Sequence, residues 1–158
     1  MTLTGARPLL EESVVVCRET GNLFVLGLAL FNLAEIATNQ GDYATACERY
    51  QEVLGLLAAS RNVDNMNPAF ESIAELAACL QQPRRGVRLF ATAAAIRERS
   101  GTPVLPGDRG DYDRQKNLLR TALDKEAFAE EWAAGSAMTT DEAIELAKAI
   151  TLVAEDCG

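Results

Sequence analysis

The stretch LAEIA at Leu33–Ala37 returns as IAELA at Ile73–Ala77, 40 residues further along the chain. Three further sets of similar residues keep the same offset of 40: Ala6, Ala46 and Gly86; Leu10, Tyr50 and Phe90; and Thr20, Ser60 and Ser100. A fixed period in the range of roughly 20 to 50 residues is typical of solenoids, in which each unit buries its apolar face only by stacking on neighbours. The sequence therefore predicts stacked repeats.

The composition indicates that these repeats are helical. Of 158 residues, 48% are hydrophobic and 6% are aromatic, with alanine and leucine prominent, which favours helix over sheet. Apolar residues recur at helical spacing in five segments: 4–20, 22–40, 43–60, 67–81 and 83–100. A turn is expected at 60–67. In the first segment, the spacing places Leu9, Leu10, Val14 and Cys17 on one apolar face.

The later segments have apolar faces and caps of the same kind. The second segment carries a stripe of Leu26, Leu30, Leu33, Ile36 and Ala37, and Ile73, Phe90 and Ile144 are expected on the apolar faces of later helices. Asn22 and Asp42 are expected to cap the second and third helices. Phe128 and Trp132, four residues apart, are expected to pack in the core, or alternatively to form an aromatic binding ledge.

The segment 101–110 breaks the repeat, because it holds two prolines and three glycines. Three further helices are expected after it, near 112–123, 127–135 and 139–150, and they do not follow the period. Thr139 and Glu142 form a capping box at the start of the last one. We therefore expect an all-α solenoid of antiparallel helix pairs, with repeats over 1–102, the first unit truncated, and a three-helix C-terminal cap over 103–158 in the same domain.

The charge distribution argues against nucleic-acid binding by this segment. The formal net charge is −8, whereas binding to phosphates requires clustered Lys and Arg. The basic side chains that do gather belong to one predicted helix: Arg84, Arg85, Arg88, Arg97 and Arg99. They either grip an acidic partner or are exposed charge that pairs with neighbours such as Glu98.

Neither a metal site, a cofactor nor an enzymatic activity is expected. The four cysteines are too far apart for a CxxC pair, and the chain contains no histidine. No nucleophile lies beside a base at a recognisable spacing. The most apolar stretch, Leu23–Phe31, is about half of the ~20 residues that cross a bilayer. A cytoplasmic protein with reduced cysteines and no membrane association is therefore expected.

The segment LFNLAEIATNQGDYATACERYQEVL, Leu30–Leu54, resembles a tetratricopeptide repeat. The features shared with that family are small and aromatic residues at the helix crossing and the turn: Ala34, Gly41, Tyr43, Ala46 and Tyr50. The copy at Phe70–Ala93 departs from the family pattern, with Gln81 in place of the turn glycine and Pro83 in place of the tyrosine.

Nearly the whole chain is similar to the C-terminal helical region of large bacterial multidomain ATPase and transcriptional regulators of the LuxR/AfsR type. The residues that carry this resemblance are RLFATAAAIRERSGTPVLPGDRGDYDRQ and ALDKEAFAEEWAAGSAMTTDEAIELA. The resemblance implies a sensing or partner-binding role inside such a regulator. The chain itself contains no phosphate-binding loop and no DNA-reading helix.

The tetratricopeptide resemblance also implies a binding groove lined by the first helix of each unit. The residues that this implies are Leu28, Phe31, Glu35, Thr38, Asn39, Glu71 and Glu75. Phe31 would be an apolar anchor and the glutamates would favour a basic or amphipathic peptide. Alternatively, these glutamates are ordinary solvated surface.

Three functions remain open at this point. The first is a non-catalytic module that binds a peptide, another protein or other domains of a parent protein. The second is a homodimer formed through the first helix. The third is a small-ligand sensor with a pocket between the second and fourth helices.

Overall fold

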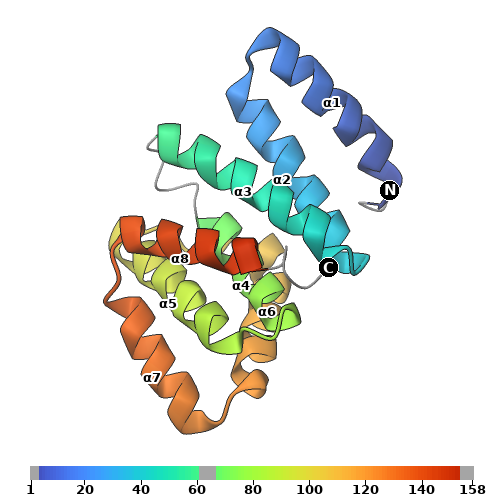
Figure 1. The fold of residues 1–158 in the computed structure, drawn as a ribbon. Coiled ribbons are helices and arrows are strands. Elements are labelled where there is room, and N and C mark those ends of the chain that lie inside the picture. The colour runs from blue at the N-terminus through green and yellow to red at the C-terminus, as the bar shows by residue number, and fades with distance from the viewer. Residues whose placement is uncertain (1–3, 61–66, 154–158) are drawn as a thin grey trace. The chain divides into compact units, whose positions relative to one another are not determined.

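The computed structural model describes residues 4–60 and 67–153, and every regular element in these ranges is a helix. The elements are η1 (Thr4–Ala6), α1 (Arg7–Thr20), α2 (Leu23–Asn39), α3 (Tyr43–Ser60), α4 (Asn67–Cys79), α5 (Pro83–Ser100), η3 (Pro106–Asp108), α6 (Arg109–Ala122), α7 (Lys125–Ser136) and α8 (Thr140–Val153). The prediction of an all-α, solenoid-like fold is confirmed (Figure 1). Most of the turn expected at 60–67 lies outside the described residues.

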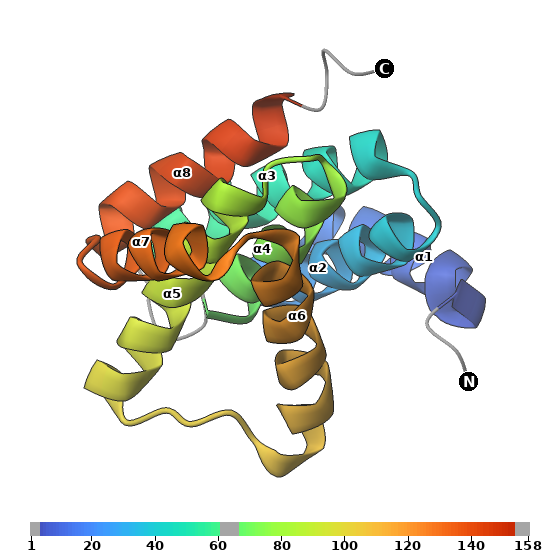
Figure 2. The same cartoon turned by 90° about the horizontal axis from the view of Figure 1, so that it is seen from below.

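The chain divides into two compact units. Of the described residues, unit 1 comprises 4–60 and 151–153, and unit 2 comprises 67–150. In unit 2, two helices of the predicted repeats, α4 and α5, pack with two helices of the predicted cap, α6 and α7. Figure 2 shows the connecting segment of residues 101–108, which joins the end of α5 to the start of α6 within unit 2.

The 40-residue period is present in the backbone of the turns. In the α2–α3 turn, the N–H groups of Gln40, Gly41 and Asp42 donate to the carbonyls of Ile36, Thr38 and Ala37. The α4–α5 turn repeats all three bonds 40 residues later, from Leu80, Gln81 and Gln82 to Leu76, Ala78 and Ala77. The second pair of equivalent residues also shares a left-handed backbone, with φ of 78° at Gly41 and 61° at Gln81.

Unit 1 packs α1 and α3 against α2. The apolar stripe of α2 that sequence periodicity predicted is buried: Leu26, Leu30, Leu33, Ile36 and Ala37. In α1, Val14 and Cys17 are buried, but Leu9 is 59% exposed, so its placement in the core was wrong. The reason is geometric: Leu10, Val14 and Cys17 are spaced by four and three residues and share one face, whereas Leu9 is turned about 100° from Leu10.

Two glutamates of α4 tie it to the helices that follow. Glu71 binds Arg97 of α5 through two contacts, Oε2 to Nε at 2.7 Å and Oε1 to Nη2 at 2.9 Å. Glu71 is buried and Arg97 is half-buried, with side-chain exposures of 8% and 18%, so Arg97 is not the surface charge that was considered. Glu75 accepts from Arg114 at 2.7 Å and from Gln115 at 2.9 Å, both on α6.

The α7 helix approaches α5 closely because glycine stands at the crossing. A Cβ atom at Gly135 would overlap the carbonyl group of Arg88 and come within 2.9 Å of the Cβ of Ala91. The buried Thr92 hydroxyl lies 2.8 Å from the Gly135 carbonyl oxygen and 3.0 Å from that of Arg88. Small residues therefore set the distance between these two helices.

Aromatic rings join the same helices. Trp132 of α7 stacks on Phe128 at 5.5 Å between centroids and lies 6.2 Å from Phe90 of α5. Tyr112 of α6 reaches Phe90 at 5.0 Å, and the ammonium group of Lys116 lies 4.9 Å from the Trp132 ring. These contacts place Phe128 and Trp132 in packing within unit 2, as their helical spacing predicted.

The turn geometry yields a paired stability prediction. Because Gln81 occupies the left-handed region that disfavours side chains, Gln81→Gly is expected to raise the free energy of unfolding by about 1 kcal/mol. Gly41→Gln, the matched change one period earlier, is expected to lower it by a similar amount. Urea denaturation followed by circular dichroism measures both. Shifts of the same sign in both variants would contradict the equivalence of the two turns.

The two α4 glutamates yield a second stability prediction. Glu71→Gln leaves the half-buried guanidinium of Arg97 without its carboxylate and is expected to cost about 2 kcal/mol in the free energy of unfolding, below the cost for a fully buried pair. Glu75→Gln is the control, and a loss of about 1 kcal/mol or less is expected because its partner Arg114 is 55% exposed. Equal losses in the same urea titrations would count against a structural role particular to the buried pair.

Candidate partner-binding surface

The α2 helix of unit 1 carries an apolar stripe on the side opposite its buried face. Phe24, Leu28 and Phe31 follow one another at intervals of four and three residues, so they share one side of the helix. Phe24 is 66% exposed and Leu28 is 50% exposed. Large apolar side chains grouped on an exposed face are typical of sites where other molecules bind.

Local structure fixes the orientation of this stripe. The Asn22 side chain caps α2 by accepting a hydrogen bond from the Val25 N–H at 3.3 Å. Burial of the opposite side, with Leu26 and Leu30 almost inaccessible, then sets the rotation of the helix about its axis. Phe31 is half-buried, and its ring meets that of Tyr50 edge to face at 6.2 Å, so α3 supports this end of the stripe.

The remaining predicted residues of α2 continue the same side toward its C-terminal end. Glu35 is half-buried. The Thr38 hydroxyl donates to the Ala34 carbonyl at 2.9 Å, so its proton is used within the helix. Asn39 is exposed as the last residue of α2. The structure thus brings Leu28, Phe31, Glu35, Thr38 and Asn39 together on one side of unit 1.

The other two predicted residues, Glu71 and Glu75, belong to unit 2 and are engaged there. Burial raises the pKa of Glu71 even though hydrogen bonds from Arg97 act in the opposite direction. The hydrogen bond to Glu71 raises the pKa of Arg97, and burial raises that of Tyr112. Because its two carboxylate oxygens are taken up by Arg97, Glu71 is removed from the residues that can contact a partner.

The basic residues of α5 are also largely engaged within unit 2. Arg88 Nε donates to Glu131 Oε2 at 2.8 Å, and Arg84 Nη1 donates to the other oxygen of Glu131 at 3.3 Å. Arg85 donates to the Gln82 side chain at 3.0 Å. Both arginines that meet Glu131 therefore link α5 to α7, which favours the interpretation of this cluster as structural charge.

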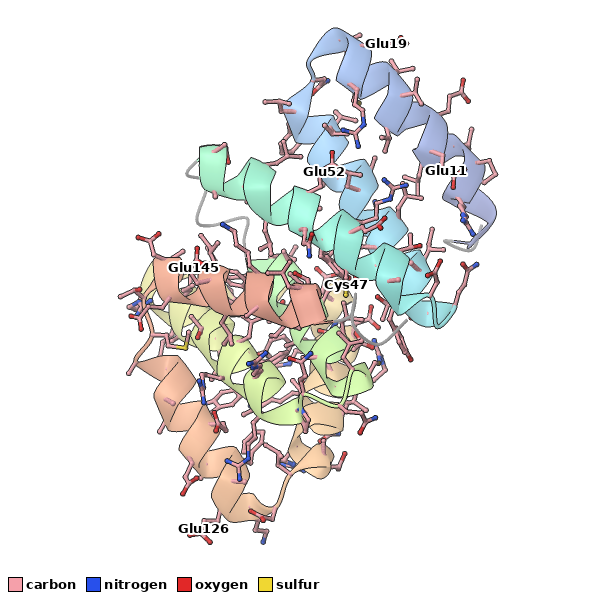
Figure 3. The ribbon with its side chains drawn as sticks, in the orientation of Figure 1. Glu11, Glu19, Cys47, Glu52, Glu126 and Glu145 are labelled. Atoms are coloured by element: carbon pink, nitrogen blue, oxygen red, sulfur yellow. The ribbon has the colours of Figure 1, made fainter. Side chains whose placement is uncertain are left out.

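A shallow hollow of about 490 Å³ lies at the surface of unit 2. Its walls come from α5, α7, the turn that follows α7, and α8: Arg88, Ala134, Met138, Asp141, Glu142, Glu145 and Leu146. It is open to solvent, unlike the enclosed pockets that hold small ligands. Figure 3 labels Glu145 on the α8 side of this hollow.

Within residues 4–60 and 67–153, no three histidine, cysteine or carboxylate side chains are grouped so that they could hold a metal ion. Cys17 and Cys47 are buried, Cys79 is half-buried, and none of the three is in a disulfide. None of the described helices combines the length and the apolar character that crossing a bilayer requires.

Sequence reasoning missed one residue of the α2 stripe. Phe24 was not among the predicted binding residues, although at 66% it is more exposed than Leu28 at 50%. Its spacing of four residues before Leu28 and seven before Phe31 is the signal that could have identified it.

Comparison with known proteins places this chain beside bacterial regulators. It is 32% identical over 121 residues to a protein of Mycobacterium tuberculosis described as a "Putative HTH-type transcriptional regulator", and equally to its counterpart in Mycobacterium bovis. The match covers 77% of this chain and 14% of each relative. No family model matches the chain, and no solved structure matches it. The chain is thus a helical protein related to part of a much longer bacterial regulator.

Proposed function

We propose that this chain is a non-catalytic interaction module of a bacterial transcriptional regulator, and that it binds an apolar, basic peptide segment on the α2 stripe of unit 1. The observation that carries the proposal is the row formed by exposed Phe24 and Leu28 and half-buried Phe31, on a helix whose other side is buried. Burial of such side chains contributes about 1.5–3 kcal/mol each to an interface.

Charge supports the basic character of the partner. Residues 1–60 hold seven acidic and three basic side chains, a net charge of 7 − 3 = 4 negative. Two of the three basic side chains, Arg7 and Arg18, pair with Glu11 and Glu52. An acidic surface raises the association rate of a basic partner and disfavours an acidic one.

A non-catalytic role fits the chemistry of unit 2. Burial raises the pKa of two side chains in unit 2, Glu71 and Tyr112. Glu71 contacts Arg97, and Tyr112 contacts the Phe90 ring. Such groups stabilise helix packing and do not assemble a nucleophile with a base. The resemblance to tetratricopeptide repeats adds the expectation of peptide binding, and the descriptions of the bacterial relatives add a transcriptional regulator as the context.

A displayed library of random 12-residue peptides, panned against the immobilised chain, tests the proposal. Enriched peptides are expected to combine aromatic or aliphatic residues with Lys or Arg. One enriched peptide is then synthesised and its affinity for the chain is measured by fluorescence anisotropy. The affinity is expected to fall at least tenfold in the double variant Phe24→Ser with Leu28→Ser, because the apolar contact area is lost. A DNA duplex under the same conditions is expected not to bind.

The matched control is the double variant Leu105→Ser with Leu118→Ser, which removes two exposed apolar side chains of unit 2 (65% and 39% exposed). This control variant is expected to bind the enriched peptide with the same affinity as the unmodified chain. The α2 site would be refuted if the two double variants weakened peptide binding equally, or if neither variant weakened it.

A further inference from the structure

The outward side of α1 presents a second apolar surface, which we call the α1 outer face. It consists of Leu9, Glu12, Val15, Val16 and Glu19. Leu9, Val15 and Val16 are about half or more exposed, at 59%, 56% and 49%, and both glutamates are exposed. The sequence Leu9, Glu12, Val16, Glu19 advances by three, four and three residues, so apolar and acidic side chains alternate along one stripe.

The charges of α1 are sorted between its two sides. Arg7 pairs with Glu11 at 3.1 Å and donates to Gln40 at 3.3 Å, while Arg18 reaches across to Glu52 of α3 at 2.7 Å. Both basic side chains are therefore engaged away from the α1 outer face. In the described part of the chain, neither Glu12 nor Glu19 forms an ion pair. Figure 3 labels Glu52 on α3 and Glu19 near the end of α1 that leads to α2.

This arrangement disfavours a second copy of the chain as the occupant of the face. Two α1 helices side by side in parallel would place Glu12 against Glu12 and Glu19 against Glu19. Antiparallel pairing about Val15 and Val16 would place Glu12 against Glu19. Like charges at such spacing are destabilising, and their burial beside valine and leucine adds a desolvation cost.

We propose that the α1 outer face binds an amphipathic helix of another protein, one that places two basic residues about seven positions apart beside an apolar seam. The carboxylates of Glu12 and Glu19 are seven residues apart, which is roughly 10 Å along a helix. Two Lys or Arg side chains with the same separation meet both carboxylates, while Leu9, Val15 and Val16 cover the seam. This surface is separate from the α2 stripe.

A designed peptide pair tests this surface with the full chain. Both peptides are 21-residue helices with leucine at the seam positions of each heptad. One carries lysine at the flanking positions, and the other carries glutamate there. Fluorescence anisotropy at 0.15 M salt is expected to show at least tenfold tighter binding of the lysine peptide. Glu12→Lys with Glu19→Lys is expected to invert the preference, so that the glutamate peptide binds more tightly.

The controls separate this site from general charge effects and from the α2 stripe. Glu48→Lys with Glu98→Lys makes the same change in net charge at other exposed helical glutamates and is expected to alter the affinity less than threefold. Phe24→Ser with Leu28→Ser is expected to leave it unchanged. The proposal would be overturned if Glu48→Lys with Glu98→Lys reduced the affinity for the lysine peptide as much as Glu12→Lys with Glu19→Lys does. It would also be overturned if the unmodified chain showed no preference between the two peptides.

Sedimentation velocity tests the competing occupant. The chain is expected to sediment as a monomer over a hundredfold concentration range. A dimer that Val16→Ser weakens would assign the face to a second copy and overturn the proposal.

Discussion

Every helix here is amphipathic along one or two stripes, and none of them can bury its apolar side chains alone. Short turns make α1 and α2, α2 and α3, and α4 and α5 run antiparallel; the stripe of α2 is covered by α1 and α3, and α5 is covered by α4, α6 and α7. The turn backbone that makes this possible recurs at Gly41 and Gln81 with the same hydrogen bonds. A local turn geometry, repeated along the chain, therefore determines which faces are buried and which remain open.

Most of the helices could be predicted from sequence, because apolar spacing and capping residues are local signals. Asn22, Asp42 and the Thr139–Glu142 box cap their helices as expected. Burial of Ile73, Phe90 and Ile144 followed from the same periodicity. Individual contacts were harder: the repeat pattern could not reveal which side chains join α4 to the nonrepeating helices, since Glu75 meets Arg114 across 39 residues of sequence.

The candidate site was only partly accessible to sequence reasoning. The resemblance to tetratricopeptide repeats grouped Leu28 with Phe31, and their positions on one helix keep them on the same side of it. Glu71 was predicted to lie on an open groove, but in the structure it binds Arg97, which is 26 residues away in sequence. The sequence around Glu71 contains no signal that identifies this partner. A glutamate on a helix reads as solvated charge until its partner is known. Similarly, Leu9 reads as core until the rotation of α1 is known.

The cluster around Trp132 has a consequence for spectroscopy. Trp132 is the sole tryptophan of the chain and is packed among Phe90, Phe128 and Lys116, all in unit 2. Indole emission therefore reports on that unit alone, whereas far-ultraviolet ellipticity sums the helices of both. A difference in midpoint temperature between thermal unfolding followed by indole emission and by ellipticity would show that the two units unfold in succession. Coincident curves would show that they unfold together.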